Sequence, residues 1–114
     1  MQDQVSLRRI VVIDDDLDIQ DLISAYFKPR GFVVSGFLNA ELAIAESVKS
    51  GNSWDVILTD LSLPGMSGVE FTERITRILP STPIILISTT RSSEVAVEAI
   101  QKGAYDFLVK PIHF

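Results

Sequence analysis

Polar side chains that could do chemistry together stand at the ends of four short apolar runs. They are Asp14, Asp15 and Asp16, then Asp60, Ser88 and Lys110. Neighbouring carboxylates repel one another and need a cation, and the chain has no cysteine and a single histidine, so the available ligands are oxygen atoms. Such a donor set favours Mg²⁺. A lysine and a hydroxyl beside an exposed carboxylate would suit phosphoryl transfer, with the carboxylate as nucleophile.

The elements that must position these residues follow from the hydrophobic pattern. Five apolar runs, most of them rich in β-branched residues, predict buried strands near residues 10–13, 32–34, 56–58, 84–87 and 107–109. Four stretches with helical spacing separate them, at residues 22–27, 42–48, 69–79 and 95–100. Caps and stops for these helices are available at Asn39, Ser92 or Ser93, Gly31, Gly51, Pro80 and Gly103. This alternation predicts an α/β fold with a parallel sheet, in which the polar strand ends converge in one pocket.

Composition excludes several other classes of function. The 114 residues fit one domain with a real core. A net charge of -5 argues against nucleic-acid binding by this domain alone. No apolar run approaches the roughly 20 residues of a membrane helix, and we see no secretory signal near the start. The absence of cysteine is typical of a cytoplasmic protein.

Each candidate residue also has a plain structural alternative. The three consecutive aspartates could cap the first helix, and Asp60 could begin an ordinary turn. Ser88 alone is uninformative, Lys110 could be a solvated surface lysine, and Phe107 could be plain strand core. The combination is what favours a site, because each residue ends a different predicted strand.

The motifs around these residues resemble the response-regulator receiver domain of two-component signalling. The resemblance covers the chain from about Leu7 to Pro111. It rests on Ile13-Asp14-Asp15-Asp16, on residues 58–68, on Ile87-Ser88-Thr89 and on Phe107-Leu108-Val109-Lys110-Pro111. It implies a flavodoxin-like, doubly wound sheet of five parallel strands in the order 2-1-3-4-5.

The resemblance also implies a role for each residue of the site. Asp60 would accept a phosphoryl group from a sensor histidine kinase or a histidine phosphotransfer protein. Mg²⁺ would be held by Asp60, by Asp15 directly, by Asp14 mostly through water, and by the backbone carbonyl of Ser62. Lys110 would pair with Asp60 at rest and with the phosphoryl group afterwards.

A further implication is a switch that other proteins can detect. Ser88 would be the switch hydroxyl, Phe107 the coupled aromatic residue, and the Lys110–Pro111 peptide bond would be cis. The surface of the fourth helix and fifth strand would then change and act on an output domain or effector, with transcription as the expected output. The activated form could be a homodimer.

Three neighbouring positions bear on the lifetime and entry of the phosphoryl group. Ser62 and Thr90 flank the place of an attacking water and offer neither a carboxylate nor an amide to orient it. We therefore expect slow self-hydrolysis of the acyl phosphate. The bulk of Thr89 is expected to restrict the entry of small phosphodonors.

Other families and functions remain open at this point. Residues 91–108 resemble the fourth helix of nitrogen-regulation-type activators, which use sigma-54, but a stand-alone regulator or a receiver fused to a kinase would look similar. A haloacid-dehalogenase-like phosphatase would use Asp14 as nucleophile and Asp16 as acid and base, although Asp18 stands where threonine or valine is usual and no capping insertion exists. An interaction module with an inactive site is the third alternative.

The end of the sequence leads to an expectation about the sheet. With the strand order given above, right-handed crossovers place the first helix alone on one face and the other three on the opposite face. Only Ile112, His113 and Phe114 follow Pro111. We therefore expect the receiver domain at 1–114 to be truncated before or at a fifth helix, within a larger regulator, and to expose an apolar strip beside the first helix.

Overall fold

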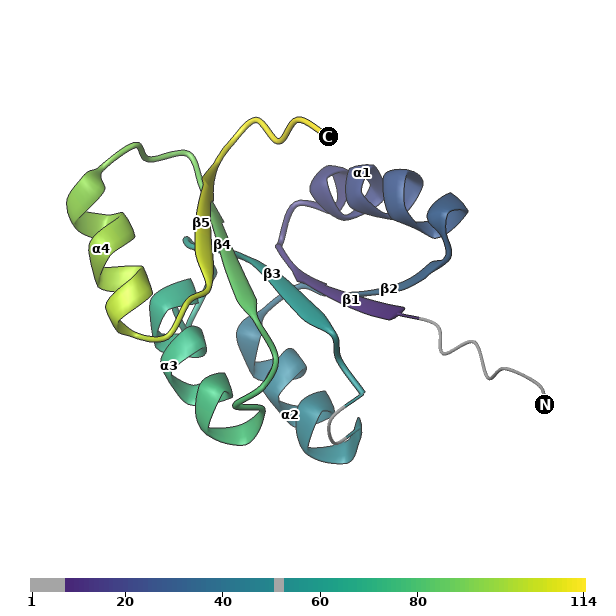
Figure 1. Cartoon of the computed structure of the whole chain (residues 1–114), viewed down its shortest axis with the longest axis horizontal. Helices are drawn as coiled ribbons and strands as arrows, with labels where there is room; N and C mark the ends of the chain where they lie inside the picture. Colours follow the sequence, from purple (N-terminus) through teal and green to yellow (C-terminus); the bar gives the residue numbers. More distant parts are fainter. Residues whose placement is uncertain (1–7, 51–52) are drawn as a thin grey trace.

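Strands and helices alternate along the chain in the computed structural model, which describes residues 8–50 and 53–114 (Figure 1). The elements are β1 (Arg8–Ile13), α1 (Leu17–Phe27), the 3₁₀ turn η1 (Lys28–Arg30), β2 (Phe32–Phe37), α2 (Ala40–Ser50), β3 (Val56–Asp60), α3 (Gly68–Ile78), β4 (Ile84–Ser88), α4 (Ser93–Gln101) and β5 (Asp106–Val109). The five strands form one parallel sheet in the order β2-β1-β3-β4-β5. The predicted fold class and strand order are confirmed.

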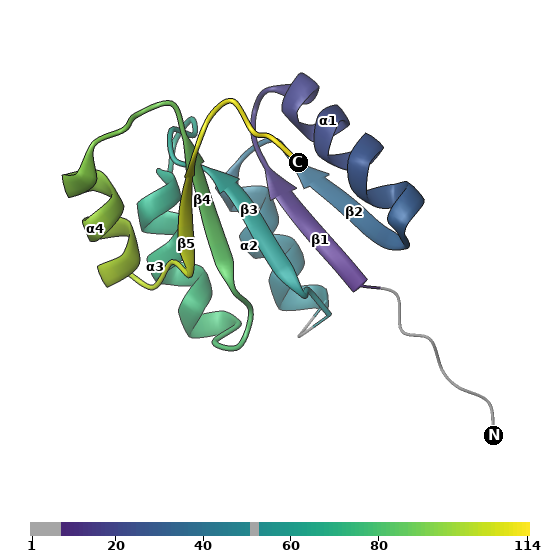
Figure 2. The same ribbon diagram turned by 45° about the horizontal axis from the view of Figure 1, so that its top comes forward.

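The two faces of the sheet are covered unequally, as the crossover rule predicts (Figure 2). On one face, Val11 and Ile57 pack with the fully buried Phe71 and Ile75 of α3 and with residues of α2. On the other face, the side chains that alternate with these pack against α1, where Ile23 is fully buried. α4 covers the β5 edge on the same side as α3.

Side-chain caps set where the helices begin. The side chain of Asp16 accepts a hydrogen bond from the Asp18 N–H (2.9 Å) and caps α1. Asn39 accepts from the Leu42 N–H (2.9 Å) at the start of α2, as predicted. Of the two candidate serines for α4, Ser92 is the cap. The predicted stop at Gly51 lies outside the described residues.

Among the strands, β2 differs most from its predicted extent. The apolar run ends at Val34, but the strand continues to Phe37 because Ser35 and Gly36 pair with Val11 and Val12 of β1. Backbone pairing therefore extends the strand beyond its apolar residues.

Within the part of the chain that the structure describes, no helix follows β5. Leu108 of β5 is 40% exposed, on the side of the sheet opposite to Phe107 and α4. Ile112 packs against the cluster on the α1 side, and the ring of Phe114 stacks on Tyr26 with 4.4 Å between ring centroids. The last residues thus lie over the face that α1 occupies (Figure 2).

Candidate functional site

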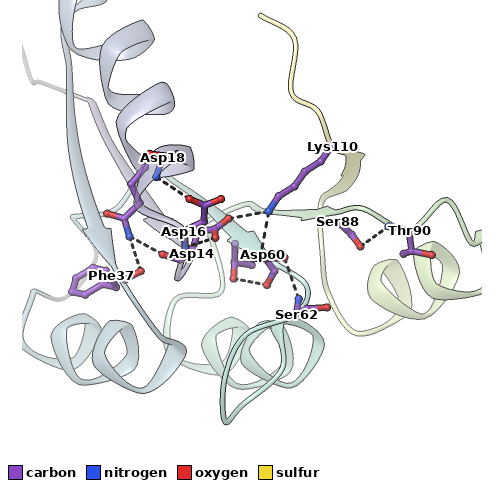
Figure 3. Close-up of polar contacts among 11 residues, drawn as sticks. Asp14, Asp16, Asp18, Phe37, Asp60, Ser62, Ser88, Thr90 and Lys110 are labelled. Atoms are coloured by element: carbon purple, nitrogen blue, oxygen red, sulfur yellow. Dashed lines mark hydrogen bonds and ion pairs between the residues drawn. The ribbon is translucent and has the colours of Figure 1, made fainter.

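Four of the predicted site residues, Asp14, Asp15, Asp60 and Lys110, meet at the carboxyl ends of the strands (Figure 3). Asp14 follows β1, Asp60 is the last residue of β3, and Lys110 follows β5. Asp14, Asp15 and Asp60 each offer a carboxylate oxygen within 4.8 Å of the others. This is the crevice where ligands bind in an open parallel sheet.

Lys110 lies between two of the carboxylates. Its Nζ is 3.3 Å from Asp14 Oδ2 and 3.5 Å from Asp60 Oδ2. The predicted pairing with Asp60 is confirmed, and the shorter contact to Asp14 is additional. The Lys110–Pro111 peptide bond is cis, as predicted. The Lys110 N–H donates to the carbonyl of Ser88 (2.7 Å), which joins β5 to the end of β4.

Burial disfavours the charged forms of Asp14 and Lys110. Asp14 is 1% exposed, and its pKa is raised, first by desolvation and also by the charge of Asp60; the Asp16 N–H and the Lys110 ammonium oppose this rise. Burial acts to lower the pKa of Lys110, but the charges of Asp60 and Asp14 outweigh it, so that pKa is raised and the ammonium is kept.

The donor set fits a hard divalent cation. Three carboxylates face one lysine, so negative charge remains in excess at the pocket. The ligand atoms that this cluster offers are carboxylate oxygens, and Mg²⁺ in proteins is commonly held by one or two of these together with water. Asp15, the expected direct ligand, is exposed, and the buried Asp14 lies behind it.

Both the carboxylate and the backbone carbonyl of Asp60 have close neighbours. The Ser62 N–H donates to Asp60 Oδ1 (3.1 Å) and fixes the carboxylate. Gly68, the first residue of α3, lies so close to β3 that a Cβ there would overlap the carbonyl oxygen of Asp60 and come within 2.9 Å of Leu61 Cα. A glycine is therefore needed for α3 to approach the site.

Two hydrogen bonds, in which the hydroxyl groups of Ser88 and Thr90 accept from backbone N–H groups, connect Ser88 to α4; we call them the hydroxyl relay. The Ser88 Oγ accepts from the Thr90 N–H (3.0 Å), and the Thr90 Oγ1 accepts from the Ser92 N–H (3.2 Å). Ser92 in turn caps α4. Ser88 is 4% exposed and Thr89 is exposed, while Phe107 packs on β4 and α4.

The structure separates the three consecutive aspartates by role. Asp14 is buried in the cluster, Asp15 belongs to it from the surface, and Asp16 caps α1. The helix-cap alternative thus holds for Asp16. In a haloacid-dehalogenase-like mechanism Asp16 would be the acid and base; in this structure one of its carboxylate oxygens, Oδ1, accepts the Asp18 N–H instead.

Sequence reasoning missed Gln20, whose side-chain amide touches the ends of both β1 and β2. Its only sequence signal is a glutamine in an otherwise amphipathic helix, which does not indicate such a contact. In residues 8–50 and 53–114, no helix has the length and apolar character required to cross a membrane.

Both the sequence and the fold of this chain match known proteins. The sequence profile described as "Response regulator receiver domain" matches residues 10–114. The chain belongs to the receiver-domain family of response regulators. Receiver domains of this kind are signalling domains of two-component systems. A receiver-domain structure from Clostridium thermocellum superposes with a TM-score of 0.86 at 28% identity, over 94% of this chain and 85% of that one.

Two curated relatives show how the family is used in longer proteins. The C4-dicarboxylate transport transcriptional regulatory protein DctD of Rhizobium meliloti (strain 1021) is 35% identical over 102 residues, which are 90% of this receiver domain and 22% of the relative. A protein-glutamate methylesterase/protein-glutamine glutaminase of Agrobacterium fabrum is 38% identical over 110 residues, covering 93% of this chain and 30% of the relative. The chain therefore spans less than a third of the length of either relative.

Proposed function

We propose that this receiver domain is a phosphorylation-dependent switch whose phospho-acceptor is Asp60. The convergence of Asp60 with Asp14, Asp15 and Lys110 carries the proposal, because it places a nucleophilic carboxylate beside a lysine and a cation-binding pair. The donor would be a phosphohistidine of a sensor kinase or of a histidine phosphotransfer protein. An Asp60 oxygen would form a bond to phosphorus as the phosphorus–nitrogen bond breaks, and the imidazole would leave with the electron pair.

Each neighbour of Asp60 has a definable task in that transfer. Asp14, Asp15, Asp60 and the Ser62 carbonyl would hold Mg²⁺, which when bound neutralises charge on the transferring group. The Ser62 N–H keeps Oδ1 oriented. Lys110 contacts Asp60 Oδ2 before phosphorylation and would contact a phosphoryl oxygen afterwards. The chain would thus catalyse its own phosphorylation without being an enzyme toward another substrate.

Phosphorylation would act on the hydroxyl relay. The new group adds about one negative charge and three acceptor oxygens. Ser88, which accepts from the Thr90 N–H at rest, would turn to donate to a phosphoryl oxygen. The Thr90 N–H would lose its partner, the relay to the Ser92 cap would rearrange, and Phe107 would rotate into the vacated space. The α4 and β5 surface would shift as a change in population between two packings.

The same pocket predicts a long-lived acyl phosphate. Ser62 and Thr90 present no carboxylate or amide that could orient an attacking water. Thr89 is exposed, where its bulk would hinder small phosphodonors more than a smaller side chain would.

The output is inferred from the names of the relatives. The name of DctD supports control of transcription, whereas the methylesterase supports a linked enzyme. The sigma-54-dependent kind of transcription rests only on the resemblance of residues 91–108. We favour transcription, in the cytoplasm, through an attached output domain or a partner and with homodimerisation as one route. The exposed Leu108 further suggests that a fifth helix of the larger regulator packs on this face.

Intact mass spectrometry tests the proposed function. Acetyl phosphate with Mg²⁺ should add one phosphoryl group to the wild-type chain and none to Asp60→Asn. The matched control Asp21→Asn, at an exposed position of α1, should be labelled like the wild type. If neither acetyl phosphate nor a cognate kinase labels the wild type, the proposal is wrong.

A further inference from the structure

Gln20 of α1 joins three elements at the edge of the acidic cluster. Its Nε2 donates to the carbonyl oxygen of Asp14 (2.9 Å) and to the carbonyl oxygen of Phe37 (3.0 Å). The Phe37 carbonyl also accepts from the Asp14 N–H (3.1 Å). One side-chain amide therefore connects the residues at the ends of β1 and β2.

These bonds complete the fixation of Asp14. Its N–H is held by Phe37 and its carbonyl by Gln20, while its carboxylate accepts from the Asp16 N–H (2.9 Å) and contacts the Lys110 ammonium. The carbonyl belongs to the Asp14–Asp15 peptide plane, which sets where the Asp15 side chain begins. Asp15 is exposed, and the orientation of this plane is one determinant of where its carboxylate lies.

Gly36 of β2 leaves the room that Gln20 uses. A Cβ at Gly36 would overlap Gln20 Oε1 and lie within 2.7 Å of Gln20 Cδ. The backbone angle of Gly36 is not in the left-handed region, so space rather than conformation is what a side chain there would violate. Glycine weakens a strand, and the contact with Gln20 gives a reason for its presence.

We propose that Gln20 is a positioning residue for the Asp14–Asp15 pair, and that Gly36 is the small residue that lets its amide reach both carbonyls. The inference rests on the proposed function, since it concerns how the pair is set for Mg²⁺. Groups that orient metal ligands without touching the metal commonly change metal affinity by tenfold or more when they are removed.

Substitution of Gln20 tests the role of its donors. Gln20→Met keeps the length of the side chain and removes both N–H donors. The Kd for Mg²⁺ should rise about tenfold. NMR titration measures this Kd from the Asp16 and Ser62 amide signals, at a temperature where each variant is fully folded. The matched control Gln101→Met, at an exposed position of α4, should keep the wild-type Kd.

Substitution of Gly36 tests the same contact from the other side. Gly36→Ala should raise the Kd for Mg²⁺ as Gln20→Met does, although it leaves Gln20 itself intact. In a Gln20→Ala background, Gly36→Ala should cause no further change, because no side chain remains to be displaced. Additive effects of the two substitutions would show that they act separately and would overturn the pairing.

Titration of the wild type with Mg²⁺ distinguishes a failure of the Gln20 inference from a failure of the proposed function. If the wild type shows no saturable Mg²⁺ binding, the proposed function is wrong and the inference falls with it. If the wild type binds Mg²⁺ and the Gln20 variants bind it equally well, with only a lower thermal midpoint in the absence of metal, Gln20 is structural and the inference alone is overturned.

Discussion

The interior of the domain and the carboxyl end of its sheet differ in the kind of side chain that they bury. Between the sheet and α3, the side chains of Ile57, Phe71 and Ile75 are apolar and fully buried. At the carboxyl end of β1, Asp14 is almost as deeply buried although it is a charged group, and Lys110 lies 3.3 Å from it. Burying apolar groups stabilises the fold, whereas burying charges commonly costs stability. We therefore attribute the charges at the carboxyl end to the cation and the phosphoryl group that we propose it binds.

Removing apolar volume from the interior should give the largest change in stability. Ile75→Ala should lower the free energy of unfolding by about 3 kcal/mol, because a cavity forms at a fully buried position. Urea denaturation measures the change, and Ile75→Val, expected to cost about 1 kcal/mol, serves if the first variant is too unstable. Mg²⁺ affinity of the folded protein should stay unchanged in both. A weaker Mg²⁺ affinity would show that the two regions are not independent.

Removing the buried charge should have the opposite sign. Without Mg²⁺ at pH 7, Asp14→Asn should raise the free energy of unfolding by about 1 kcal/mol. The substitution removes a desolvated carboxylate that also faces Asp60, and Asp60 remains to pair with Lys110. The control Asp15→Asn, at an exposed position, should change it by less than about 0.5 kcal/mol. Added Mg²⁺ should stabilise the wild type more than Asp14→Asn. A destabilised Asp14→Asn would mean that the carboxylate supports the fold.

The pH dependence of stability sharpens the same point. The pKa of Asp14 is higher in the folded chain than its ordinary 3.8, so the folded state holds this proton more tightly. The contribution of Asp14 is then most favourable below pH 3.8 and falls as the pH rises through the raised pKa. Subtracting the stability of Asp14→Asn from that of the wild type across acidic to neutral pH should give a declining curve without Mg²⁺. A rising curve would contradict the raised pKa.

A smaller change is expected in the lifetime of the acyl phosphate. Ser62→Asn combined with Thr90→Glu supplies groups that can orient water, and one such hydrogen bond in the transition state corresponds to about fivefold faster decay. Phosphoryl loss is followed by mass spectrometry after the phosphodonor is removed. Ser81→Asn, before β4 at the other end of the sheet, should leave the lifetime unchanged. Equal lifetimes in all three proteins would rule out water orientation as the limit.

Much of the fold could be predicted because its signals are local. Strands buried on both faces appear as apolar runs, and glycine, proline and cap residues mark the helix ends, as Asn39 does for α2. The end of β2 could not be predicted, because Ser35 and Gly36 join the strand through pairing with β1. Ser92 and Ser93 could not be told apart as caps from their type alone.

The pairing of Lys110 with Asp60 could be predicted from the sequence, but other contacts around the site could not. The lysine contact to Asp14 depends on how β1 and β5, 96 residues apart at this pair, come together across the sheet. The Gln20 contacts require α1 and two strands to be in place, and neither Gln20 nor Gly36 carries a chemical signal by itself. The expected fifth helix stays a prediction.

Chemical localisation of the phosphoryl group tests the central claim most directly. After incubation with a phosphodonor and Mg²⁺, borohydride reduction converts an aspartyl phosphate to homoserine, which peptide mass spectrometry places in the sequence. We predict homoserine at position 60 in the wild type and none in Asp60→Asn. Homoserine at position 14 would indicate the phosphatase-like chemistry instead, and its absence everywhere, with acetyl phosphate and with a cognate kinase, would contradict the account.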